Sequence, residues 1–149
     1  GLPMSHPDDV RLAIVREEER GFAAAAHLMT MVPLWGVVFL ACLWLYFRES
    51  SREVVFHVQQ ALVYHMVMLS AFCVWLLVEL ALMPIQVLAR WVAEYANDVN
   101  TALLGVVLAI YGLGALVGCV QTYRGQPFLY PAIGRRVLRG AARKSMMGD

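Results

Sequence analysis

The sequence predicts an all-α integral membrane protein, and three long apolar stretches carry this prediction. They run over residues 21–47, 54–83 and 100–120. Each is long enough to cross a bilayer, because a transmembrane helix needs about 20 mostly apolar residues. The chain has 149 residues, of which 60% are hydrophobic and 15% charged, whereas soluble domains carry about 25% charged residues. Lipid is therefore the expected solvent for most of this protein.

Composition excludes some partners and cofactors. A formal net charge of +1 gives no reason to expect nucleic acid as a partner. Cys42, Cys73 and Cys119 lie inside the apolar stretches at no metal-binding spacing, and we interpret them as small buried residues. The chain starts with polar residues, so no cleavable signal peptide is predicted, and Met4-Ser5 is interpreted as the native start.

Three segments follow from the hydropathy pattern. We expect a polar N-terminal helix over 1–20, a transmembrane helical domain over 21–123 and a basic tail over 124–149. Pro33 lies inside the first span and predicts a kink, which membrane helices tolerate when neighbours satisfy the freed carbonyl. The polar link over 48–53 is short, so the first two spans must form an antiparallel hairpin.

Pro84 is predicted to end the second span, and the segment 84–99 has a different character. Its apolar residues recur at helical spacing, and Arg90 and Glu94 form an i,i+4 pair. This pattern predicts an amphipathic helix lying in the membrane interface. A surface helix packed on the bundle is an equal alternative, and a fourth short span is a further one.

Two features of the third span and the tail suggest contacts. Small residues at helical spacing let membrane helices approach closely, and packing within the chain is favoured over a homodimer face. The tail predicts a basic amphipathic helix over 131–144 that lies on anionic lipid headgroups. The small residues are Gly105, Ala109, Gly112, Gly114 and Gly118, and the basic ones are Arg135, Arg136, Arg139, Arg143 and Lys144.

The distribution of basic residues predicts an orientation. With three spans, four Lys or Arg residues lie on the side of the N-terminus and of 84–99, and eight lie on the side of the 48–53 link and the tail. By the positive-inside rule, the link and the C-terminus are cytoplasmic and the N-terminus is outside. The expected location is a bacterial inner membrane. A fourth span would place both termini on one side.

Histidines and one acid are the candidate polar sites. In the three-span arrangement, His27 and His57 lie near opposite membrane faces, and His65 differs from His27 in depth, so neither a haem nor a metal site is predicted. We expect no cofactor. Glu79 lies within a span, where an ionisable group is a functional hypothesis. A Glu79–His27 pair is one interpretation, and two side chains that reach separately to the headgroups are the favoured one.

His57, Gln60 and Tyr64 lie on one helix face at the start of the second span. They could hydrogen-bond to the first span, to the tail or to a partner. Fixing of helix ends is favoured over ligand binding. The sequence contains no HExxH, GxSxG or phosphate-binding glycine motif, so we do not expect an enzyme.

Short motifs resemble a known family. They are His27-Leu28, Pro33-Leu34, Val55-Phe56-His57-x-x-Gln60-Ala61-Leu62 and Tyr123-Arg124-Gly125 followed by Tyr130-Pro131. Together they resemble a bacterial family of small membrane proteins of unknown function (domain of unknown function 4870). That family is distantly similar to the Tic-twenty-type subunit of the plastid inner-envelope import translocon. The resemblance implies a compact bundle of three or four helices, no known enzyme activity and a part in protein transport or membrane-complex assembly.

The resulting expectation is a non-enzymatic helical bundle that acts through contacts with other membrane proteins or with itself, as an accessory or translocation-associated component. The first alternative is a small transporter or channel-like carrier that uses Glu79 and His27. The second is a cofactor-holding subunit of a respiratory or photosynthetic complex.

Overall fold

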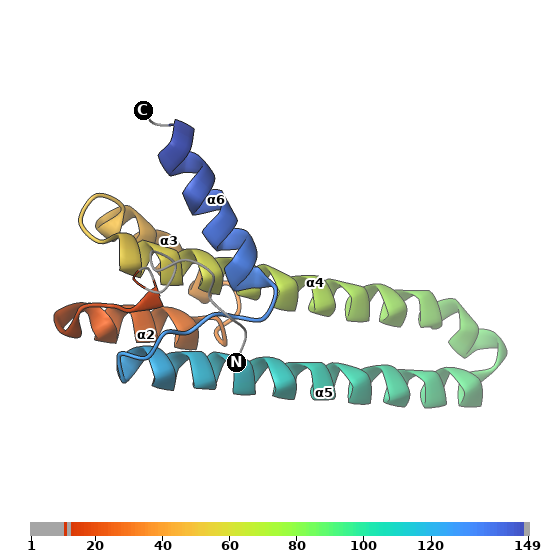
Figure 1. The fold of residues 1–149 in the computed structure, drawn as a ribbon. Coiled ribbons are helices and arrows are strands. Elements are labelled where there is room, and N and C mark those ends of the chain that lie inside the picture. Colours follow the sequence, from red (N-terminus) through yellow and green to blue (C-terminus); the bar gives the residue numbers. More distant parts are fainter. Residues whose placement is uncertain (1–10, 12, 148–149) are drawn as a thin grey trace. The chain divides into compact units, whose positions relative to one another are not determined.

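The computed structural model describes residue 11 and residues 13–147, with side chains as far as Gly140. The described residues contain helices and no strand (Figure 1). The chain divides into two units, one of residues 1–65 with 114–149 and one of residues 66–113. The elements are η1 (Glu17–Glu19), α2 (Arg20–Met29), α3 (Trp35–Phe47), α4 (Arg52–Leu88), α5 (Arg90–Tyr123) and α6 (Ile133–Met147).

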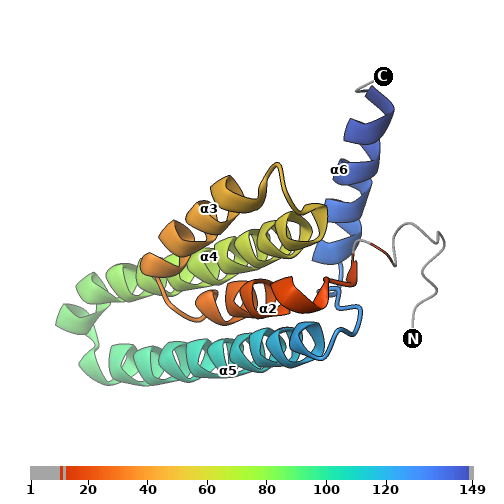
Figure 2. The same ribbon diagram turned by 90° about the vertical axis from the view of Figure 1, so that its left-hand side faces the viewer.

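The first apolar stretch is not one continuous helix. It folds into α2 and α3, which run antiparallel to each other (Figures 1 and 2). The chain reverses around Pro33, where a Cβ at Gly36 would collide with the carbonyl of Met29. The two helices have 10 and 13 residues, or about 15 and 20 Å, and the hydrocarbon core is about 30 Å thick. The prediction of three transmembrane helices is therefore not confirmed.

Two other helices are long and apolar enough to cross a membrane, judged by length and composition. They are α4, with 37 residues, and α5, with 34. At 1.5 Å per residue their lengths are about 55 and 51 Å. Each exceeds the hydrocarbon thickness, so each can cross it with turns left over at its ends.

The interfacial helix predicted over 84–99 does not exist as a separate element. Pro84 lies inside α4, which continues to Leu88, and α5 begins two residues later at Arg90. The two helices nearly join, because the amide of Ala89 donates to the Ile85 carbonyl at 2.8 Å. The predicted Arg90–Glu94 ion pair is present at 2.6 Å. The segment is thus shared between two long helices.

The first unit packs α2 and α3 against the beginning of α4 and the end of α5 (Figures 1 and 2). Alanines give α2 a narrow buried face, which allows close helix contacts. The apolar core contains Val15, Ala23, Ala26, Leu40, Leu43, Phe47, Val54, Val58 and Ala61.

The second unit is the antiparallel hairpin formed by the end of α4 and the beginning of α5 (Figure 1). Large apolar side chains such as Leu77, Leu103 and Ile110 are more than half exposed there. A surface of this kind suits lipid rather than water. Cys42 in the first unit and Cys73 in the second are also exposed, and Cys119 is half-buried, so the interpretation of the cysteines as buried is wrong for two of the three.

The ends of the chain agree with the predictions in part. A helix forms over Ile133–Met147 as predicted, with Arg135, Arg136 and Arg139 exposed. The side chains of Arg143 and Lys144 lie outside the described residues. The predicted polar helix over 1–20 also lies mostly outside them, and its described end is the single turn η1.

Candidate functional site: a buried histidine and tyrosine cluster

Two histidines meet in the first unit. Nε2 of His27 on α2 lies 3.1 Å from Nδ1 of His57 on α4, and both side chains are fully buried. The prediction that they lie at different depths is wrong. It assumed that α2 and α3 form one span, whereas α2 begins beside the start of α4 and carries His27 about two turns into the unit.

When both rings are neutral, a single assignment of the ring protons satisfies all the hydrogen bonds of this pair. Nε2 of His57 lies 3.2 Å from the Ala13 carbonyl, which can only accept, so this nitrogen carries the proton. Nδ1 of His57 must then accept from Nε2–H of His27. The remaining nitrogen, Nδ1 of His27, accepts from the Tyr130 hydroxyl at 2.9 Å. This series of hydrogen bonds therefore links the N-terminal segment, α2, α4 and the segment after α5.

Gln60 holds that last segment by its backbone. Its Oε1 accepts from the Tyr130 amide at 3.1 Å, and its Nε2 donates to the Phe128 carbonyl at 3.5 Å. The side chain is fully buried. One primary amide thus satisfies two buried main-chain groups outside any helix, which would otherwise be costly to bury.

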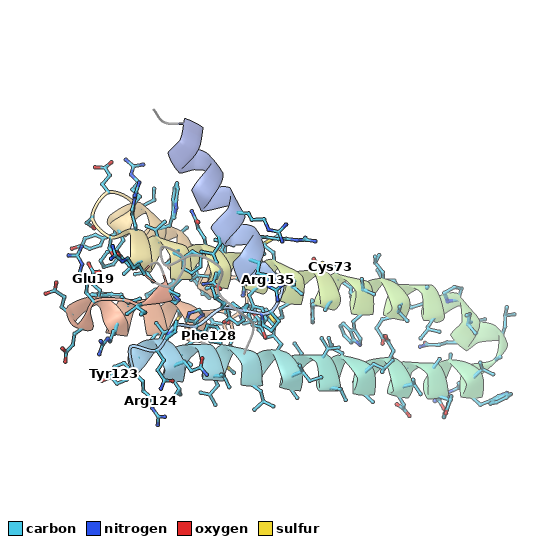
Figure 3. All side chains as sticks on the ribbon, in the orientation of Figure 1. Glu19, Cys73, Tyr123, Arg124, Phe128 and Arg135 are labelled. Atoms are coloured by element: carbon cyan, nitrogen blue, oxygen red, sulfur yellow. The ribbon has the colours of Figure 1, made fainter. Side chains whose placement is uncertain are left out.

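Aromatic rings surround His27. Phe128, labelled in Figure 3, lies edge-on at 5.2 Å between ring centroids. Tyr130 stacks on Tyr64 of α4 with centroids 3.9 Å apart. These contacts insert the non-helical residues 128–130 into the helical unit, and Gly125 (φ 72°) lies in the turn before them.

Two of the predicted small residues make room for these rings. A Cβ at Gly118 would lie 2.7 Å from the Phe128 ring, and one at Gly114 would collide with the Tyr64 hydroxyl. Gly105 has no neighbour within 4 Å of an added Cβ. Ala109 is exposed and Gly112 half-buried. The stripe is therefore divided between packing inside the first unit and an open face of the second.

His65 closes the reversal between α2 and α3. Its Nδ1 donates to the Thr30 carbonyl at 2.8 Å, and the Thr30 hydroxyl donates to the His27 carbonyl at 2.6 Å. Carbonyls at a helix C-terminus have no partner within the helix, so these bonds satisfy the end of α2. Nε2 of His65 is buried and has no hydrogen-bond partner in the part of the chain that the structure describes.

Glu79 has its partners inside the second unit. Its carboxylate accepts from the Asn100 side-chain amide at 2.6 Å. The Asn97 amide, with its nitrogen turned toward the carboxylate, also donates to it. Asn100 donates to the Trp75 carbonyl at 3.4 Å as well. His27 is bonded to His57 and Tyr130 in the first unit, so no described contact supports the interpretation of Glu79 and His27 as a pair.

The arrangement is suited to holding elements together. Both ring nitrogens of His27 and of His57 take part in hydrogen bonds. Among the described residues, no group of three or more His, Cys, Asp or Glu side chains could hold a metal ion. Sequence reasoning selected His27, His57 and Gln60 but missed Phe128, Tyr130 and His65 as members of the site. The Tyr130-Pro131 motif was the available signal.

Comparison with known proteins identifies a different family from the one expected. The profile of the magnetosome magnetite crystal formation protein family (MamF/MmsF) matches residues 18–137. No curated protein and no solved structure matches the chain. The matched range contains His27, His57, Gln60 and Tyr130. The resemblance to the family of unknown function and to the Tic-twenty-type translocon subunit is therefore wrong, because its short motifs are too few to separate families of small helical membrane proteins.

Proposed function

This chain belongs to the MamF/MmsF magnetosome magnetite crystal formation protein family, and we propose that it acts as a non-enzymatic component of the magnetosome membrane. In this proposal it contributes to magnetite crystal formation through contacts with lipid and with other membrane proteins or further copies of itself. The proposal does not extend to protein translocation.

The observation that carries the proposal is the use made of the buried polar groups. Hydrogen bonds that join α2, α4 and the segment after α5 use the side chains of His27, His57 and Gln60. Such a network fixes one arrangement of helices. This rigidity supports a function that depends on the outer surface of the protein.

A carrier remains the second candidate because of Glu79. This carboxylate lies in a candidate span and is half-buried between Asn97 and Asn100, and ionisable groups in such positions often mark transport pathways. The carrier has less support, because both amides already satisfy the carboxylate and His27 has its own partners.

One complementation experiment separates the two candidates. A magnetite-forming bacterium that lacks the gene is complemented with the wild-type chain, Glu79→Gln or Glu94→Gln. The first substitution removes the charge, and the introduced amide keeps an acceptor oxygen for Asn100. Glu94 is exposed and pairs with Arg90, so its variant is the matched control. Crystal size, crystal number and cellular iron are measured in each strain.

The contact proposal expects wild type and both variants to restore crystals of the same size. A carrier that depends on Glu79 expects Glu79→Gln alone to lose crystals, with protein levels in the membrane unchanged. Mild-detergent purification from the same cells completes the test. A chain that is monomeric, copurifies with no membrane protein and still supports crystal growth would contradict a role through protein contacts.

A further inference from the structure

The two ends of the α2–α3 pair lie together. Glu19 immediately precedes α2, and Ser51 follows α3. The Ser51 hydroxyl donates to the Glu19 carboxylate at 2.7 Å. The rings of Phe22, in the first turn of α2, and Phe47, at the end of α3, are 5.1 Å apart between centroids. The chain thus enters this pair of helices and leaves it at the same place.

The end of α5 lies at that place too. The Arg20 guanidinium packs on Gly125, where an added Cβ would lie 2.5 Å from its central carbon. Arg20 is the first residue of α2, and Gly125 lies two residues beyond α5. In Figure 3, Glu19, Tyr123 and Arg124 lie at the same end of the first unit. The entry to α2, the exit from α3 and the exit from α5 therefore share one end.

Several main-chain groups of the reversal between α2 and α3 are satisfied by protein. His65 donates to the Thr30 carbonyl, and the amides of Met31, Val32 and Gly36 all donate to carbonyls nearby. Irregular backbone at membrane depth is tolerated only where protein or a water-filled cavity covers it. These bonds satisfy part of the reversal, and its exposed side chains are apolar, with Leu34 77% and Trp35 76% exposed, which suits lipid rather than water. The pair of α2 and α3 is therefore suited to enter the bilayer and return without crossing it.

We propose that the chain crosses the membrane twice, through α4 and α5, and that α2 and α3 form a re-entrant hairpin. The arginines that this topology places on one side of the membrane then bind anionic lipid headgroups. In this topology the N-terminal segment, the 48–51 link and α6 share one side. Eleven of the 12 Lys and Arg residues fall on that side, and Arg90 alone falls on the other. The positive-inside rule then assigns this side to the cytoplasm.

The occupant of this face follows from its charge. Within α6, residues 133–147 carry five Lys or Arg residues and no acid, and Arg135, Arg136 and Arg139 are exposed. Exposed arginines also precede α4 and follow α5: Arg48, which pairs with Glu49 at 3.3 Å, and Arg124. Clusters of basic residues next to membrane spans attract anionic leaflets. This inference concerns topology and lipid, so it stands or falls independently of the role in crystal formation.

Labelling of single cysteines tests the topology. The native cysteines are replaced by alanine, and one cysteine is introduced at each of four positions in turn. A membrane-impermeant maleimide is then added to sealed vesicles of either orientation. Each variant must elute from size exclusion like the wild type. The four substitutions are Glu18→Cys, Ser50→Cys, Gln126→Cys and Ala89→Cys.

The two-span topology expects positions 18, 50 and 126 to react from one side and position 89 from the other. Three spans would place 18 and 89 together, opposite 50 and 126. Reaction of 18 and 50 from opposite sides therefore overturns the proposal. If Glu18→Cys does not fold, an N-terminal epitope tag on the wild-type chain, probed with protease in the same vesicles, gives the same distinction.

Hydrogen exchange tests the lipid. The whole chain is placed in nanodiscs of phosphatidylcholine alone or with phosphatidylglycerol. Amides of α6 are expected to exchange about tenfold more slowly with the anionic lipid. The combined Arg135→Gln, Arg136→Gln and Arg139→Gln variant should lose this difference. Arg90→Gln, on the other side, should keep it. Equal exchange of wild-type α6 in both lipids would overturn the assignment of anionic headgroups.

Discussion

Nε2 of His27 and Nδ1 of His57 lie 3.1 Å apart in a fully buried setting, although the two residues are 30 positions apart in the chain. This bond ties α2 to α4, and its neighbours at Ala13 and Tyr130 extend it to the N-terminal segment and to the residues after α5. Four segments thus depend on two imidazoles. The consequences can be measured.

Replacing His57 by phenylalanine should destabilise the fold. The ring fits a similar volume but leaves the His27 Nε2–H and the Ala13 carbonyl without their partners, and each buried orphan costs about 1–3 kcal/mol. The free energy of unfolding in mild detergent checks this. Tyr130→Phe removes one donor and keeps the ring contacts, so its loss should be smaller, about 1 kcal/mol. A His57→Phe variant as stable as the wild type would contradict the network.

Replacing Gln60 by alanine should release the residues after α5. The amide of Tyr130 loses its acceptor and the Phe128 carbonyl its donor, so the Tyr130 amide should exchange with solvent faster by roughly tenfold or more. Gln59→Ala is the matched control, since Gln59 is only half-buried. Equal exchange in the two variants would show that Gln60 does not hold the segment.

Alanine substitutions at two glycines of α5 should have opposite effects. At Gly118 the new methyl group meets the Phe128 ring at 2.7 Å, so we expect destabilisation by about 1–3 kcal/mol from overpacking. At Gly105 there is free space, and the higher helix propensity of alanine should stabilise by up to about 1 kcal/mol. Thermal unfolding of both variants checks the signs. If Gly105→Ala instead abolished self-association, this position would belong to an interface between copies.

Ser51→Ala should loosen the start of α4. The hydroxyl of Ser51 donates to Glu19 at 2.7 Å and accepts from the Val54 amide at 3.3 Å, and loss of such a cap costs about 0.5–2 kcal/mol. Ser50 is exposed, so Ser50→Ala should leave the unfolding midpoint unchanged. Two serine variants with the same midpoint would argue against the bond that joins the two ends of the α2–α3 pair.

The sequence alone predicted the class of protein and the helix at its basic end. Apolar stretches of this length have few alternatives to helices in lipid, because every main-chain group must be bonded within the segment. The hydropathy pattern also selected the polar residues at the start of α4, because His57 and Gln60 interrupt an apolar stretch. It failed at Pro33 and Pro84, where hydropathy is the same whether the helix continues, kinks or reverses.

The tertiary structure decided where the polar residues meet. In a single span, residues 21–47 would carry His27 away from His57; folded back as α2 and α3, they bring the two rings into contact. Pro84 stays helical while the chain turns at Pro33, because the outcome depends on which neighbours satisfy the free main-chain groups. In the reversal around Pro33 those neighbours include His65, which bonds to the carbonyl of Thr30, 35 residues before it. Hydropathy reports the solvent of each residue, whereas only the packed helices report its partners.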